Sequence, residues 1–246
     1  MPKSDDHLSF IQWKDLKNIQ DQTVYSFGLI VQKMRTEVTR LINAIGSQAA
    51  YTPLRQSNFV SLVMLFRIRE SMLSIELLIS KGLAHDAAAL LLSLIELRLE
   101  IQYVVLSSSH ADEWIARKKQ QAEPWPVETL FQELFPDEET RQAEKANYQH
   151  FVQMHHADPM GRQPDFPIKE DAIVSASRDE LAVCLFCAGS ECYRILKAAA
   201  TDFADAGFHI ENSLAAVEEL HELNKKLQSI QKKKPAPAAR KYYPGA

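Results

Sequence analysis

The sequence predicts an all-α protein: a single-domain helical bundle of six to seven main helices with two buried central helices. Glycine contributes only 7 of the 246 residues, and most of the 11 prolines lie between residues 124 and 167 or after 234. Long stretches are therefore free of helix-breaking residues. Within them, apolar residues recur every three to four positions, as on one face of a helix. Hydrophobic residues make up 46% of the chain, which is ample for one core.

The expected helices follow one another with short connections. After a shorter helix at 10–19, the main helices are predicted at 24–45, 57–80, 85–107, 109–122, 137–155, 177–206 and 212–231. Glycines stand where three of these helices should stop, at positions 46, 82 and 207. Residues suited to capping stand at four starts, namely Ser57, Ser109, Asp137 and Ser177. The proline-bounded connection at 124–136 should hold one short amphipathic turn, and residues 157–169 should form a loop.

Two helices, at 57–80 and 85–107, are apolar on nearly every face and should form the buried centre of the bundle. The second has the length of a membrane span. It carries three charges near its middle, Glu96, Arg98 and Glu100. Each would cost roughly 2.5–3.5 kcal/mol at the centre of a bilayer, so a buried central helix is the better interpretation.

Arg69 and Glu96 are the charges expected to meet across these two helices. Arg69 shares a face with Glu76, seven residues on, in an otherwise apolar helix. Because buried charges need partners, Glu96→Ala is expected to cost roughly 3–5 kcal/mol. Two interpretations stay open: an ion pair that fixes helix register, or a ligand-binding pocket lined by Arg69, Glu96 and nearby histidines.

Three histidines and an aspartate gather where the helix at 137–155 gives way to a loop. They are His150, His155, His156 and Asp158. Imidazole suits acid–base chemistry near neutral pH, and the segment is expected to border the main cleft, with Asp158 as a ligand-binding residue. The alternative is that these histidines are surface residues favoured near a helix C-terminus. His150 and His155 lie roughly 140° apart around a helix, so we predict no metal site there and no cofactor.

Several chemistries are disfavoured by what the sequence lacks. It contains no P-loop, no GxGxxG, no GxSxG, and no second histidine to complete a zincin helix after His221. Cys184, Cys187 and Cys192 lie in an apolar helix, and no second cysteine pair completes a zinc site. We expect buried core thiols, in keeping with a reducing compartment.

The ends of the chain suggest a cytoplasmic protein with a basic tail. The first residues, MPKSDDHLSF, lack the features of a signal peptide. Seven of the 28 Lys and Arg residues lie after Leu223 with no acid among them, leaving 21 basic against 32 acidic residues elsewhere. We therefore divide the chain into a bundle domain at 1–231 and a flexible tail at 232–246, which could contact an acidic partner or nucleic acid.

Part of the chain resembles an uncharacterised bacterial all-helical family, a domain of unknown function. The stretch from Arg69 to Glu76, the corner GLAHDA at 82–87, the sequence LLSLIE ending at Glu96, and Tyr148 followed by His155 and His156 carry the resemblance. Family members often have arginine before the serine of the LLxSLIE motif, where this chain has Leu92. The resemblance implies an all-helical fold and a bacterial source.

A more distant similarity is to HEPN-type bundles, many of which are ribonuclease toxins or defence effectors. These carry an arginine and a histidine four to six residues apart on one helix. The nearest match here is Lys145 with His150, and lysine lacks the bidentate fork of a guanidinium.

Two functions follow, and the sequence leaves open whether the protein is an enzyme. The first is a non-catalytic regulatory or interaction module, in a toxin–antitoxin or phage-defence context, acting with a protein partner or as a homo-oligomer. The second is a HEPN-like, metal-independent ribonuclease that uses His150, His155 or His156 with Lys145 or Arg69. RNA is then the substrate. Neither function involves a membrane.

Overall fold

The computed structural model describes residues 22–120, 125–156 and 178–233. Within these ranges it contains eight α-helices and no strand, which confirms the all-α prediction. The helices are α1 (Gln22–Gln48), α2 (Gln56–Ser80), α3 (Ala84–Val104), α4 (Ser108–Lys119), α5 (Val127–Leu134), α6 (Glu138–His156), α7 (Arg178–Asp205) and α8 (Glu211–Lys233). The count exceeds six to seven because the turn expected between the prolines is the helix α5. The helix predicted at 10–19 lies outside the described residues.

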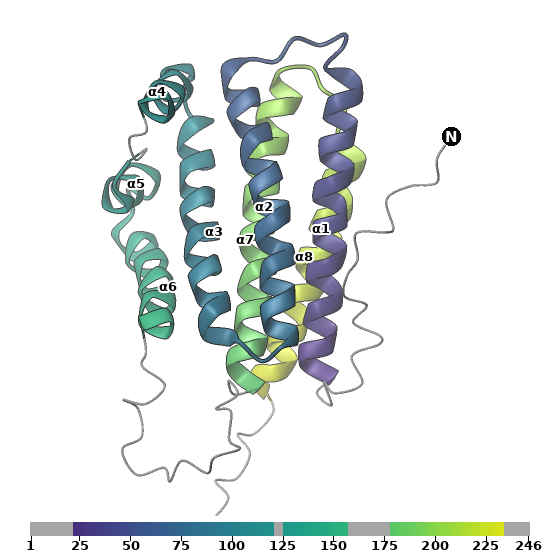
Figure 1. Cartoon of the computed structure of the whole chain (residues 1–246), viewed down its shortest axis with the longest axis vertical. Helices are drawn as coiled ribbons and strands as arrows, with labels where there is room; N and C mark the ends of the chain where they lie inside the picture. Colours follow the sequence, from purple (N-terminus) through teal and green to yellow (C-terminus); the bar gives the residue numbers. More distant parts are fainter. Residues whose placement is uncertain (1–21, 121–124, 157–177, 234–246) are drawn as a thin grey trace, which may run out of the picture.

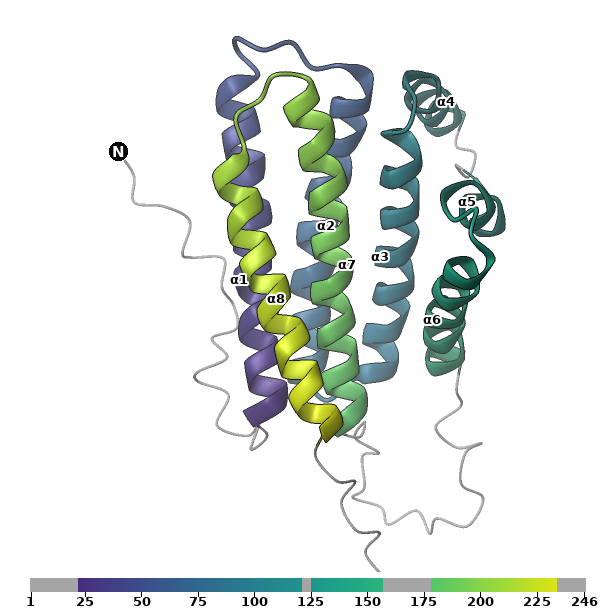
Figure 2. The same cartoon turned by 180° about the vertical axis from the view of Figure 1, so that it is seen from behind.

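Five long helices form the body of the bundle. In Figure 1, α2 lies in front with α1 and α3 at its sides, and Figure 2 shows α7 and α8 on the opposite side. Helix α7 packs against four others, α1, α2, α3 and α8, so it shares the centre with the two helices predicted to lie there. Helices α4, α5 and α6 form a second layer along the outer side of α3 (Figure 1). None of the described helices combines the length and hydropathy of a membrane span.

The helix ends agree with the predicted signals in part. Gly82 and Gly207 have φ angles of 78° and 89°, in the left-handed region that glycine adopts without strain, and they follow α2 and α7 as predicted. Gly46 does not end α1, which continues to Gln48. Helix α8 continues to Lys233, so the predicted tail boundary at 232 falls inside a helix.

The predicted N-caps were partly wrong. Asp137 does cap α6, because its Oδ2 accepts a hydrogen bond from the Thr140 amide at 2.8 Å. Helix α4 begins at Ser108, one residue before the predicted start, and is capped by Ser107 in place of Ser109; Ser107 Oγ accepts from the Ser109 amide. Ser57 lies inside α2, and Ser177 lies outside the described residues.

Ser57 instead belongs to a polar junction between α2 and α7. Its Oγ donates to Asp202 Oδ1 at 2.8 Å, while Asn58 Nδ2 and Ser61 Oγ donate to Asp202 Oδ2 at 2.8 and 3.1 Å. Asn58 and Ser61 are completely buried. One carboxylate on α7 therefore accepts hydrogen bonds from three side chains at the start of α2, which fixes how the two helices are aligned.

Candidate functional site

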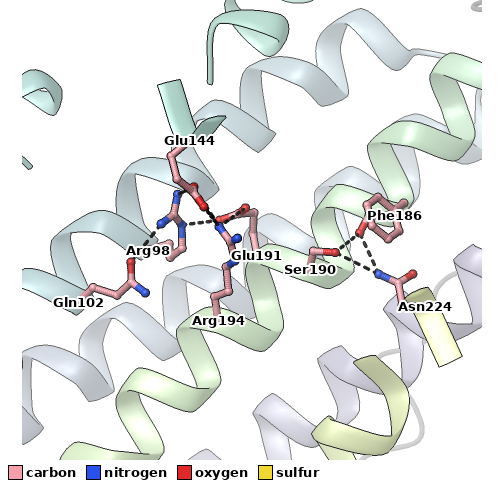
Figure 3. Close-up of polar contacts among 8 residues, drawn as sticks. All are labelled: Arg98, Gln102, Glu144, Phe186, Ser190, Glu191, Arg194 and Asn224. Atoms are coloured by element: carbon pink, nitrogen blue, oxygen red, sulfur yellow. Dashed lines mark hydrogen bonds and ion pairs between the residues drawn. The ribbon is translucent and has the colours of Figure 1, made fainter. Parts of the chain in front are cut away.

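A ring of four charges joins α3, α6 and α7 (Figure 3). Arg98 of α3 is completely buried, and its Nη2 donates to Glu144 Oε2 of α6 at 2.8 Å, while its Nε lies 2.6 Å from Glu191 Oε2 of α7. Arg194, one turn after Glu191, closes the ring through Nη1, 2.7 Å from Glu144 Oε1 and 3.7 Å from Glu191 Oε1. Each carboxylate thus contacts both guanidinium groups, and the four charges sum to zero.

The surroundings of the ring explain how it is tolerated in the core. Arg98 Nη1 donates to Gln102 Oε1 at 3.0 Å, and the guanidinium lies 5.7 Å from the centre of the Phe135 ring. Burial raises the pKa of Glu191 above its ordinary value, against the lowering effect of Arg98 and Arg194. Only Arg194, with 40% of its side chain exposed, reaches the surface. The ring's chemistry is therefore to hold three helices together.

A second buried ion pair joins α1 and α2. Arg35 Nε donates to Glu76 Oε1 at 2.8 Å, and Glu76 is completely buried. Arg35 was not predicted from the sequence as a buried charge. Its spacing nonetheless indicates a buried position. Arg35 follows Val31 by four residues and precedes Val38 by three, which places it on the apolar stripe of α1. Glu191 lies on the stripe of α7 in the same way, between Ala188 and Ile195.

The seam between α7 and α8 also contains a buried polar group. Asn224 of α8 is completely buried, and its Nδ2 donates to the Phe186 carbonyl at 2.9 Å and to Ser190 Oγ at 3.3 Å (Figure 3). A Cβ atom at Gly189 would lie 3.0 Å from Asn224 Nδ2, so glycine leaves the space that this side chain occupies. A single polar contact in an apolar seam favours one register between the two helices.

The predicted pair between Arg69 and Glu96 does not form. Arg69 Nη2 lies 3.9 Å from Glu70 Oε1 and its guanidinium lies near the Phe66 ring, whereas Glu96 Oε1 accepts a hydrogen bond from Tyr148 Oη of α6 at 2.8 Å. The pairing was wrong because Glu96 faces α6, a helix that packs on the other side of α3 from α2. Within the described residues, Arg69 and Glu96 thus contact different partners.

Tyr148 and Glu96 nonetheless bring together two of the four stretches that carry the predicted resemblance to a domain of unknown function. Burial and the adjacent carboxylate raise the pKa of Tyr148 to about 12. The phenol therefore stays protonated at neutral pH and donates to Glu96. This contact, the ion pair of Glu144 with Arg98, and the hydrogen bond between His85 Nδ1 and the Met154 carbonyl at 2.7 Å attach α6 to α3.

Tyr148→Phe should lower the free energy of unfolding by about 0.5–1.5 kcal/mol, the usual net value of one hydrogen bond. Glu96→Ala should have a comparable effect, because no buried guanidinium loses its partner. Urea denaturation followed by circular dichroism measures both, with Tyr51→Phe, at a position 90% exposed, as the matched control. A loss of 3–5 kcal/mol in Glu96→Ala alone would restore the original pairing hypothesis.

The predicted histidine site is only partly described. His150, His155 and His156 are exposed on α6, with the last two rings 4.8 Å apart. Lys145 forms an ion pair with Glu128 of α5. Asp158 lies outside the described residues. Among the described residues, no group of three or more His, Cys, Asp or Glu side chains could hold a metal ion.

The three cysteines are free thiols on α7, and Cys184 and Cys192 are buried as expected. Burial raises the pKa of the Cys184 thiol to about 12, and the thiol pKa values of Cys187 and Cys192 are also raised by burial. They are therefore poor nucleophiles at neutral pH, in keeping with a packing role.

A shallow groove of about 310 Å³ lies between α1 and α8. Lys33 and Arg40 line one side, Glu219 lines the other, and none of the predicted site residues takes part. The groove is separate from the ring of charges.

No protein family, curated protein or solved structure matches the chain. Both resemblances therefore stay predictions.

Apolar side chains remain exposed on α2, although α1, α3, α4 and α7 all pack against this helix. Phe59, Phe66 and Leu77 are 49%, 41% and 38% exposed. Their spacing of seven and eleven residues places all three within about 20° of one line along the helix, opposite the completely buried Ile68. We call this surface the outer face of α2. Figure 1 shows α2 in front of the other body helices on this side.

Proposed function

We propose that the protein is a non-catalytic interaction module that binds another protein chain through the outer face of α2. The observation that carries the proposal is the line of exposed aromatic and aliphatic side chains at Phe59, Phe66 and Leu77. Single exposed apolar residues are common on protein surfaces, but three large ones aligned on one helix mark a candidate contact surface. Such a stripe suits a helix as partner, because its members lie about two and three turns apart along one face.

The placement of charged groups supports this function over ribonuclease activity. The buried carboxylates of the ring bind guanidinium groups, so neither is poised to exchange protons with a substrate. Lys145 pairs with Glu128, and His150 is exposed on another part of α6. A metal-independent ribonuclease needs an acid or base together with a cation at the scissile phosphate. In the described structure the predicted cation, Lys145, is held by a carboxylate instead, which favours the interaction module.

Site-specific photo-cross-linking in living cells tests the proposal. With benzoylphenylalanine in place of Phe66, irradiation should give a protein adduct of defined mass. The same residue at Leu223, an apolar position of α8 that is 48% exposed, serves as the matched control and should give none. The difference is expected because only the outer face of α2 is held against a partner.

Two results would contradict the proposal. One is the absence of any adduct from position 66. The other is cleavage of single-stranded RNA by the purified protein in the presence of a chelator, if His150→Ala or His155→Ala abolishes it. That second result would establish the ribonuclease function instead, because loss of activity on removing an imidazole identifies it as the acid or base.

A further inference from the structure

We infer that the partner on the outer face of α2 is α2 of a second copy of this chain, lying antiparallel across a twofold axis at the level of Ile68. The inference rests on the proposed function and names its partner. A symmetric dimer uses the same patch on both subunits, so the patch must be complementary to itself when turned end to end. The outer face of α2 meets this condition in both its apolar and its charged positions.

The apolar residues are arranged symmetrically about Ile68. Phe59 and Leu77 lie nine residues before and after it, and nine residues at 100° each place both of them directly opposite Ile68. In the antiparallel pair, Phe59 therefore faces the partner's Leu77, and the reverse contact forms at the other end. Leu62 and Leu73 lie along one edge of the face, so Leu62 of each copy lies near Leu73 of the other copy. The two Phe66 rings pack near the axis.

The charges obey the same symmetry. Arg67 and Glu70 are exposed. At 100° per residue, Arg67 lies about 80° from Phe59 on the edge of the face away from Leu62 and Leu73, and Glu70 lies about 20° from Phe59 on the same side of the line. A twofold axis perpendicular to the helices keeps each edge on its own side, so Arg67 lies within one residue's rise of the partner's Glu70. The contact occurs twice, once on each side of the axis. Apolar residues along the line with an opposite charge pair beside it are the arrangement of an antiparallel helix pair.

Light scattering coupled to size-exclusion chromatography measures the outcome. The wild-type protein should elute at twice the chain mass of 27.9 kDa, with dissociation on dilution over about two decades of concentration. Phe66→Asp should elute at the mass of one chain, with unchanged helical content. Ile230→Asp, at an exposed apolar position of α8, should remain a dimer.

Charge reversal tests the antiparallel pairing without removing an apolar side chain. Arg67→Glu places two acids opposite each other, Glu70→Arg places two bases opposite each other, and each variant alone should be monomeric. An equimolar mixture of the two should form heterodimers, because both contacts then join opposite charges. The double variant Arg67→Glu/Glu70→Arg should also recover the wild-type mass.

A wild-type mass of one chain at every concentration would overturn the inference, as would a dimer that survives Phe66→Asp or a mixture that stays monomeric. The cross-linking experiment separates this failure from failure of the proposed function. An adduct of two copies supports both. An adduct with a different protein keeps the interaction function and overturns self-association.

Discussion

Arg98→Met is expected to destabilise the fold by roughly 3–5 kcal/mol, the cost of breaking a buried ion pair. Methionine fills much of the space of the arginine side chain but leaves Glu191 buried without its nearest guanidinium, now 2.6 Å away. Thermal and urea unfolding measure the loss. Lys225→Met, which removes a cation from the exposed pair with Glu222, is the control and should change little.

The loss of unfolding free energy caused by Arg98→Met should become smaller as the pH falls. Burial already raises the pKa of Glu191 above its ordinary value of 4.5, and Arg98 is the main group that lowers it, so the variant raises this pKa further. A carboxyl group whose pKa is raised on folding contributes most stability below 4.5, and this contribution is lost as the pH rises through the folded-state pKa. The unfolding temperature and the urea midpoint of the variant should therefore approach those of the wild type as the pH is lowered.

The double variant Arg98→Met/Glu191→Gln separates this effect from other titrating groups. Glutamine keeps the shape of the side chain but carries no charge, so the extra pH dependence should disappear. If Arg98→Met lowered the free energy of unfolding equally at all pH values, the cause would be the lost packing of Arg98 and not the unpaired carboxylate of Glu191.

Asp202→Ala is expected to cost about 3 kcal/mol, because two buried side chains, Asn58 and Ser61, lose an acceptor together with the partly buried Ser57. A buried donor without a partner costs roughly 1–3 kcal/mol. Asp205→Ala, at an exposed position near the end of the same helix, is the control and should stay within about 0.5 kcal/mol of wild type. Equal losses in the two variants would mean that the junction adds nothing beyond the helix itself.

The helices could be predicted from the sequence because their signals are local. The apolar spacing of residues 24–45 and the glycines at 82 and 207 depend only on neighbouring residues, and the structure places α1 and the two helix stops accordingly. Gly46 failed as a stop because it lies within a helix that continues past it. The short α5 was expected only as a turn, since eight residues between prolines give little periodic pattern.

The partners of the buried charges could not be predicted in this way. Arg98 was recognised as a charge on a central helix, but its partners Glu144 and Glu191 lie 46 and 93 positions further along the chain. Helical spacing shows which side chains share a face, and says nothing of which helix covers that face. For the same reason Arg69 and Glu96 were paired although α6, not α2, covers Glu96. The outer face of α2 was missed because an apolar helix was expected to be covered on all sides.

The layered arrangement also sets how the molecule opens. Helices α5 and α6 pack only on α3 and on each other, whereas α1, α2, α3 and α7 of the body each pack on three or more neighbours. The backbone amides of α5 and α6 can thus exchange with solvent through an opening that leaves the body folded. That opening must part Glu144 from both guanidinium groups and admit water to Arg98 and Glu191. The ring of charges therefore sets the free energy of this partial unfolding as well as contributing to the stability of the whole.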